Sequence, residues 1–149
     1  MIITKFSPTR MITSVSSNLM SETQDFQYAA GSCNIGPKEI RRRKFVGFVG
    51  LVLVFITVAS FHTQHVKGLS RVSVFLPAML FSIGYLQSRK KFCLAFGLAG
   101  IFNFGSLGQV SKVISPADKA LDRKAALNLM IQSLGLATLI TVIVLVLPV

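Results

Sequence analysis

Apolar residues in this chain occur in long, uninterrupted runs rather than in the short alternating segments of membrane β-strands. Four runs without a charged residue cover 45–61, 72–88, 92–111 and 125–149. Each is close to the about 17 to 25 residues with which an α-helix crosses a hydrocarbon core about 30 Å thick. We therefore predict an all-α integral membrane protein, a small bundle of four transmembrane helices.

Proline and acidic residues mark where two of these helices begin. Pro37 suits the first helical position, and Glu39 lies in the first turn, near the positive end of the helix dipole. Ser115 precedes Pro116 and Asp118 as a second N-cap signal. We predict a membrane domain over 37–149 with helices at about 37–61, 72–88, 92–108 and 116–148. The last helix, nearly 48 Å long, exceeds the bilayer, so its first turns should protrude or lie along the headgroups.

The first 36 residues differ from the rest and are predicted to form a flexible N-terminal tail. Residues 1–21 are rich in Ser and Thr and carry no acid, which is the composition of an organellar transit peptide. Met20 is an alternative start, which would make the preceding residues an upstream extension. A secretory signal is not predicted, because no apolar core of about 7 to 15 residues follows the early bases.

The charge balance changes the picture of what this protein binds. Only 14% of residues are charged, against about 25% in soluble domains, and 16 bases against 5 acids give a net charge of +11. The bases stand beside the apolar runs rather than in a stripe interleaved with aromatics, so no nucleic-acid partner is expected. We predict a basic belt at the inner membrane face that contacts anionic headgroups or an acidic partner, formed by Arg41, Arg42, Arg43, Lys44, Arg89, Lys90 and Lys91.

The distribution of Lys and Arg also constrains the threading, because cytoplasmic loops collect them. If all four runs cross, eight bases lie inside and six outside; if 92–111 is a re-entrant glycine-rich segment, the division is twelve and two. Charge favours three spans plus the re-entrant segment, but exposed backbone at membrane depth is unfavourable. We keep four spans as the prediction and the three-span arrangement as the alternative. Both place the N-terminus inside and differ in the side of the C-terminus.

Small and polar residues inside the runs are the candidate contacts. On a helix over 92–108 four glycines would lie within an arc of about 140°, which permits close approach of another subunit or of the chain's own helices; these residues are Gly97, Gly100, Gly105 and Gly108. Asn103 lies in the same run, and Asn128 and Gln132 lie one turn apart in the last. Such amides either join helices or line a path for a neutral solute.

No set of residues predicts catalysis, a metal or a cofactor. The apolar runs contain no ionisable acid or base for proton-coupled transport, and phosphate-loop, GxSxG and HExxH motifs are absent from the sequence. Cys33 and Cys93 form no metal or disulfide pattern, and His62 and His65 have no third ligand nearby. We therefore expect a non-catalytic accessory or scaffolding subunit among other integral membrane subunits. The alternative is a small oligomeric channel or carrier for a neutral or lipidic solute.

Overall fold

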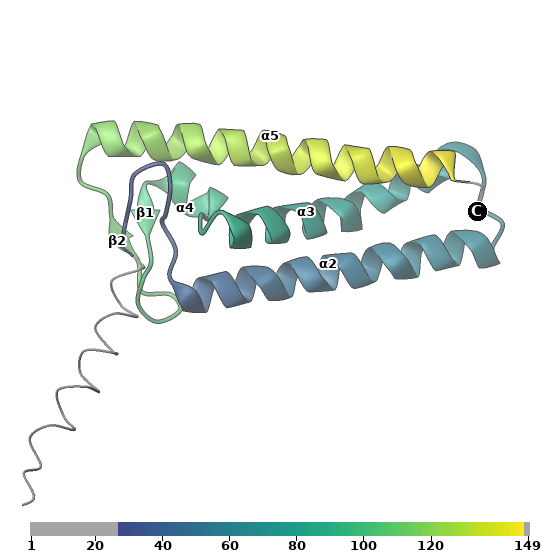
Figure 1. Cartoon of the computed structure of the whole chain (residues 1–149), viewed down its shortest axis with the longest axis horizontal. Coiled ribbons are helices and arrows are strands. Elements are labelled where there is room, and N and C mark those ends of the chain that lie inside the picture. Colours follow the sequence, from purple (N-terminus) through teal and green to yellow (C-terminus); the bar gives the residue numbers. More distant parts are fainter. Residues whose placement is uncertain (1–26, 148–149) are drawn as a thin grey trace, which may run out of the picture.

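The computed structural model describes residues 27–147, and three long helices dominate this part of the chain (Figure 1). They are α2 (Pro37–Thr63), α3 (Phe75–Arg89), which continues a 3₁₀ helix η1 (Gly68–Val74), and α5 (Pro116–Val146). Helix α3 lies between the other two (Figure 1). Much of the predicted tail, including the transit-peptide segment 1–21, lies outside the described residues.

The long helices begin where local chemistry predicts. Pro37 and Pro116 occupy first-turn positions of α2 and α5, and the Ser115 hydroxyl accepts a hydrogen bond from the Asp118 amide at 3.4 Å. The expected helix at 72–88 is instead divided between η1 and α3. Pro77 lies in the first turn of α3, where its missing N–H costs least, so the α-helical bonds begin just before it.

Three helices are long and apolar enough to cross a membrane among residues 27–147, namely Pro37–Thr63, Gly68–Arg89 and Pro116–Val146. At 1.5 Å per residue, the charge-free parts of α2 and α5 extend over about 26 Å and 33 Å, which brackets a hydrocarbon core of about 30 Å. The chain therefore has the architecture of a multi-pass membrane protein with three candidate spans.

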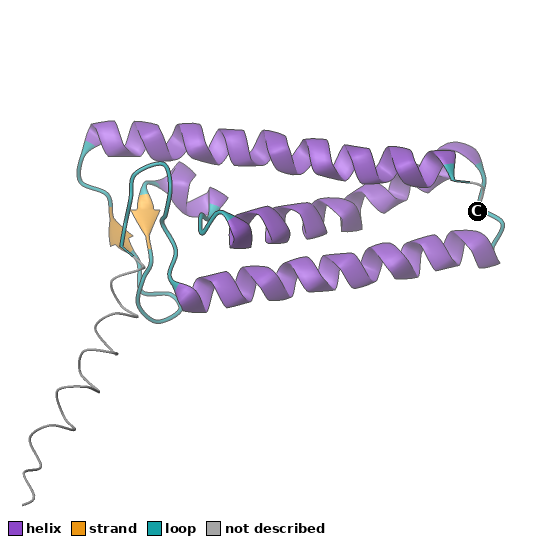
Figure 2. Cartoon of the chain, in the orientation of Figure 1, coloured by secondary structure: helices purple, strands orange, loops and turns teal. Residues whose placement is uncertain are grey.

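The predicted fourth spanning helix at 92–108 is wrong. Helix α4 covers only Leu94–Ala99 and ends at Gly100, which adopts the left-handed conformation at φ 67°. The chain then forms strand β1 (Ile101–Phe102), which pairs antiparallel with strand β2 (Ser111–Lys112) (Figure 2). Glycine makes a helix about 1 kcal/mol less favourable than alanine does, and here glycines provide the turns instead.

The three candidate spans agree in number with the three-span alternative, and the segment that this alternative expects to be re-entrant is folded into a compact unit. It lies at the end of the bundle where α2 and α5 begin (Figure 1). Gly100 faces the Lys119 side chain, and Gly97 lies against the Asp122 carbonyl, so the segment is level with the charged first turns of α5. Together, residues 27–36 and 90–115 form a small folded unit that we call the cap.

Glycines set the distance between α2 and α3. A Cβ at Gly50 would lie 2.3 Å from the Phe81 nitrogen, and one at Gly84 would lie 2.4 Å from the Gly47 nitrogen. No side chain fits in either place, so the two backbones meet directly. Small residues allow this approach, which favours helix association in lipid.

The opposite end of the bundle is closed by a core to which all three helices contribute. Its buried members are Val54, Phe61, Val74, Ala78, Ala137 and Val144. Arg71, which is also buried, donates from Nε to the Val66 carbonyl at 2.8 Å and from Nη1 to the Leu147 carbonyl at 3.0 Å. The guanidinium thus supplies a donor to the Leu147 carbonyl at the end of α5, which has no partner within the helix, and to the Val66 carbonyl before η1.

Candidate functional site

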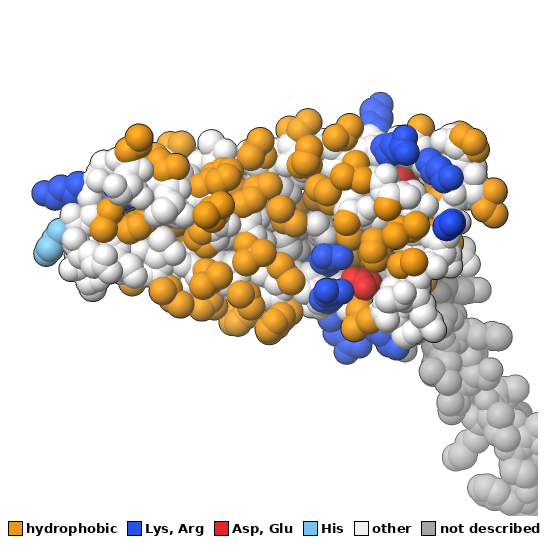
Figure 3. Space-filling view, turned by 180° about the vertical axis from the view of Figure 1, so that it is seen from behind, with side chains coloured by type: hydrophobic (Ala, Val, Ile, Leu, Met, Phe, Trp, Pro, Cys, Tyr) orange, Lys and Arg blue, Asp and Glu red, His pale blue; other side chains and the backbone are white. Residues whose placement is uncertain are grey.

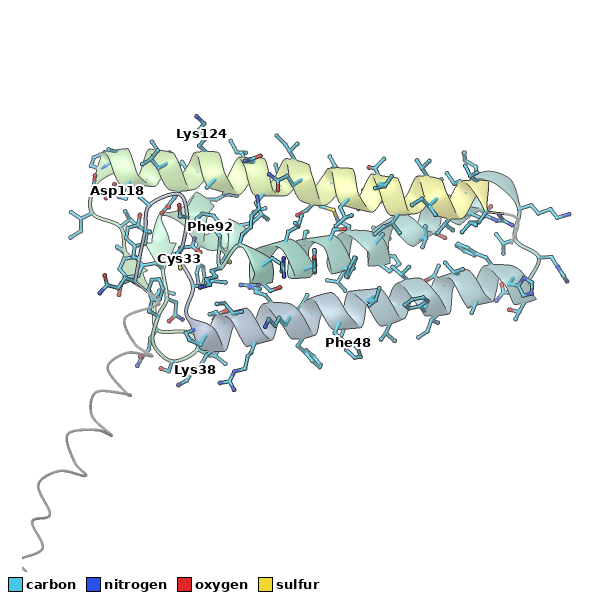
Figure 4. All side chains as sticks on the ribbon, in the orientation of Figure 1. Cys33, Lys38, Phe48, Phe92, Asp118 and Lys124 are labelled. Atoms are coloured by element: carbon cyan, nitrogen blue, oxygen red, sulfur yellow. The ribbon has the colours of Figure 1, made fainter. Side chains whose placement is uncertain are left out.

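Charge is strongly segregated along the bundle. Of the Lys and Arg residues in the described region, twelve belong to the cap or to the adjacent helix ends, and only Lys67 and Arg71 lie at the other end. Figure 3 shows blue side chains gathered near the cap and a broad hydrophobic zone beyond them. In Figure 4 Lys38 and Lys124 point away from the bundle, and Phe48 projects outward from the apolar part of α2. The cap end is therefore the candidate functional site.

Five residues of the predicted basic belt are exposed, and two are not. Arg41, Arg42, Lys44, Arg89 and Lys90 are exposed, whereas Arg43 and Lys91 are partly buried. The Arg43 Nη2 lies 3.1 Å from the Cys93 sulfur and 3.6 Å from Glu39 Oε2. Arg43 thus faces inward and holds α2 against the cap rather than a headgroup.

The cap is organised around two buried asparagines. Asn34 donates from Nδ2 to the Cys93 carbonyl at 3.1 Å, and its Oδ1 accepts from the Cys93 amide at 2.6 Å. The Asn34 carbonyl accepts from the Asn103 amide at 3.0 Å, and the Gly36 amide donates to the Asn103 carbonyl at 2.7 Å. Both asparagine side chains are essentially inaccessible.

The placement of Asn103 differs from the prediction, because this residue lies in the cap and not within a span. Its Oδ1 accepts from the Gly105 amide at 3.0 Å, and its Nδ2 donates to the Ser106 carbonyl at 3.1 Å. Its side chain therefore stabilises a turn and is not free to line a solute path.

The predicted glycine stripe does not exist as one face. Gly97 lies in α4, where an added Cβ would lie 2.6 Å from the Phe92 ring, and Gly100 ends that helix. Gly105 and Gly108 lie in the loop between β1 and β2, and Gly108 has φ 90°. These four glycines serve turns and internal packing of the cap, because the segment is not a continuous helix.

A buried carboxylate joins the N-terminal part of the cap to α5. Asp122 is fully buried, accepts from the Tyr28 hydroxyl at 2.9 Å, and accepts from the Gly31 amide at 2.7 Å. Burial and the neighbouring carboxylate of Asp122 hold the pKa of Tyr28 above its usual value. The Tyr28 ring also stacks on Phe102, with centroids 4.8 Å apart.

Asn128 and Gln132 form a hydrogen-bonded chain that ends on Lys90. The Lys90 ammonium donates to Gln132 Oε1 at 2.6 Å, and Gln132 Nε2 donates to Asn128 Oδ1 at 3.0 Å. The two amides therefore link the end of α3 to α5, on the outside of the bundle. This contact connects two predicted groups, the basic belt and the intramembrane amides, that no local sequence pattern joins.

The remaining candidate ligands, two histidines and two cysteines, do not gather into a metal-ligating group among the described residues. His62 and His65 are exposed at the end opposite the cap, and no group of three or more metal-ligating side chains occurs within residues 27–147. Both cysteines are free thiols; Cys93 is buried, and burial raises the pKa of Cys33.

Sequence reasoning missed Asn34 and Asp122, which hold the cap together. Their partners lie 59 residues or more away along the chain, so no local pattern identifies them. One weak signal was available, because Asp122 is an isolated acid beside Arg123 and Lys124.

The chain matches no known protein family, and no curated protein or solved structure shows significant similarity to it.

Proposed function

We propose that this protein is a non-catalytic integral membrane accessory or scaffolding subunit of a larger membrane complex. One observation carries the proposal: three hydroxyls buried between the spans bond to their own helices. Ser82 donates to the Ala78 carbonyl at 2.7 Å, Ser133 to Leu129 at 2.9 Å, and Thr141 to Ala137 at 2.8 Å. Because these hydroxyls are satisfied locally, they are not available to hold or relay a solute between the spans.

An aromatic stripe on α2 supports contact with other membrane subunits. Phe45, Phe48 and Phe55 are 67%, 63% and 67% exposed, and Val52 between them is 39% exposed. The spacing of three, four and three residues places all four side chains on one helical face, as in helices that pack against a partner. This stripe replaces the glycine segment as the proposed packing surface.

The charge distribution supports an orientation with the cap on the cytoplasmic side. Twelve basic residues near the cap and two at the far end match the bias of cytoplasmic flanks. Three spans then place the end of α5 on the opposite side of the membrane. The exposed part of the basic belt would meet anionic headgroups at the cytoplasmic surface.

A photo-crosslinking experiment in native membranes tests the subunit proposal. A benzophenone amino acid replaces Phe48, which is exposed, or Phe61, which is 7% exposed and serves as the matched aromatic control. We expect a discrete crosslink from position 48 to a different integral membrane protein, and only intrachain products from position 61. Lipid adducts alone at position 48 would contradict the proposal.

The second candidate, an oligomeric channel or carrier, is favoured by one observation. Asn128 is exposed and Gln132 is partly exposed on the outside of α5, where a second copy could face them. In this case position 48 would give no heterologous crosslink, and the purified homo-oligomer would conduct a neutral solute in liposomes.

A further inference from the structure

A pocket of about 260 Å³ opens where the N-terminal part of the cap crosses the end of α3 and the third and fourth turns of α5. Its lining residues are Gly31, Ser32, Lys90, Phe92, Ala125, Asn128 and Leu129. The lining thus combines hydroxyl, amide and ammonium groups with a hydrophobic wall.

The depth of this pocket corresponds to the headgroup region of a bilayer. Lys124 is the last charged residue of α5 and Arg89 the first after the apolar part of α3, and the pocket is lined by residues that closely follow these two positions in the sequence. Its residues therefore lie where hydrophobic surface gives way to basic surface on two neighbouring helices. Lipid phosphates occupy this level in a membrane.

The hydrogen-bond chain next to the pocket determines which groups are left to bind a ligand. An ammonium can only donate, so Lys90 must meet the carbonyl oxygen of Gln132 and not its NH₂ group. The Gln132 NH₂ must then donate to the Asn128 carbonyl oxygen. The amide orientations are thus fixed by chemistry, and each amide oxygen in the chain already has a donor.

The polar groups at the pocket that are left to bind a ligand are hydrogen-bond donors. Asn128 Nδ2 has no partner among the described residues, and the Lys90 ammonium has two further N–H groups. The Ser32 hydroxyl lies at the exposed rim. No acidic side chain lines the pocket, and both oxygens of the nearby Asp122 already accept hydrogen bonds and are buried. A pocket of this kind fits a ligand that is rich in acceptors and negatively charged.

We propose that this pocket binds the phosphate group of an anionic phospholipid. Lys90 and Asn128 donate to the phosphate oxygens, and Phe92, Ala125 and Leu129 contact the apolar part of the lipid next to the headgroup. Lys91 and Lys124, close to the pocket, disfavour headgroups that add a positive charge, such as phosphocholine. Gln132 acts as a positioning residue because it orients Lys90. This site is independent of the chain's having protein partners.

Lipid binding to the full chain in detergent micelles tests the proposal by native mass spectrometry. Phosphatidylglycerol and phosphatidylcholine are titrated separately, and inorganic phosphate and glycerol 3-phosphate are added as competitors. We expect retention of one phosphatidylglycerol molecule, with phosphatidylcholine held at least about tenfold more weakly, a difference of about 1.4 kcal/mol.

Three variants locate the site. Lys90→Gln and Asn128→Leu are expected to weaken phosphatidylglycerol binding about tenfold, the loss of roughly one charge-assisted hydrogen bond. Lys112→Gln removes the same charge from β2, outside the pocket, and is expected to change binding less than twofold, or about 0.4 kcal/mol. Asn128→Leu keeps every charge and separates the loss of a donor from the loss of charge. Circular dichroism confirms that each variant is folded.

Three results would overturn the proposal. Equal effects of Lys90→Gln and Lys112→Gln would show attraction by net charge alone. Equal retention of the two lipids would remove the preference for an anionic headgroup. Displacement of the lipid by millimolar inorganic phosphate would assign the pocket to a free phosphate ion rather than to a lipid.

Discussion

The contact between α2 and α3 allows a sharp prediction about a single methyl group. An alanine Cβ at position 50 would lie 2.3 Å from the Phe81 nitrogen and 2.7 Å from its Cα, where ordinary contacts are 3.4–4 Å. Since the obstructing atoms are backbone, no side-chain rotation relieves the clash, and the helices must separate by about 1 Å. A gap of about 0.5–1 Å already removes a quarter to a half of the attractive dispersion energy of each atom pair along the interface.

The energetic consequence of Gly50→Ala has two opposing parts. Overpacking a tight interface costs about 1–3 kcal/mol, while replacing glycine within a helix gains up to about 1 kcal/mol. Gly135 in α5 provides the matched control, because nothing lies within 4 Å of its would-be Cβ. Gly135→Ala is therefore expected to show only the gain in stability that comes from replacing glycine within a helix. We expect Gly50→Ala to be less stable than Gly135→Ala by about 1–3 kcal/mol, with Gly84→Ala similar.

Cys93 provides the assay. Its thiol is fully buried and contacts Arg43 of α2, so it reacts with a maleimide only when α2 separates from the cap. In a Cys33→Ser background, the labelled fraction is measured against increasing SDS in mixed micelles. The chain contains no tryptophan, so this chemical probe is preferable to intrinsic fluorescence. Equal midpoints for Gly50→Ala and Gly135→Ala, within about 0.5 kcal/mol, would refute the interface described here.

Three further perturbations test other contacts. Asp122→Ala leaves both donors, the Tyr28 hydroxyl and the Gly31 amide, without their acceptor, so we expect a loss of about 1–3 kcal/mol and faster amide exchange at Gly31; unchanged exchange would contradict this assignment. Arg71→Met removes the hydrogen bonds to the Val66 and Leu147 carbonyls, so amide exchange should rise in the last turn of α5 while the cap stays protected. Because burial raises the pKa of Cys33, its alkylation at pH 8 should be slower than that of a free thiol and should accelerate above pH 9; a rate equal to that of free cysteine would disprove its burial.

Much of the helical framework followed from local sequence, and the error at 92–111 shows where that approach fails. This run is as uncharged as the apolar parts of the candidate spans, so hydropathy alone does not distinguish a folded cap from a membrane helix. Its glycines are the distinguishing feature, since Gly100 ends α4 in the left-handed conformation. A glycine stripe requires a continuous helix over 92–108, and the same glycines make that helix unfavourable.

The inward position of Arg43 is a second feature that local sequence did not predict. Its neighbours Arg42 and Lys44 are exposed, and a belt assigned from composition treats all three alike. Each residue turns the helix by about 100°, so adjacent side chains point in different directions. Which of them faces inward depends on where Glu39 and Cys93 lie, and that depends on how the cap docks.

The sequence by itself determined the apolar helices, their starting residues and the concentration of basic residues near particular helix ends, because caps, turns and hydropathy act over a few neighbouring positions. Only the tertiary structure decided that 92–111 folds into a cap, that Asn34 and Asp122 hold it together, and that Lys90 meets Gln132. These contacts join residues 42 to 94 positions apart. Their partners are chosen by the requirement that buried polar groups be hydrogen-bonded, which only the folded arrangement of the whole chain can satisfy.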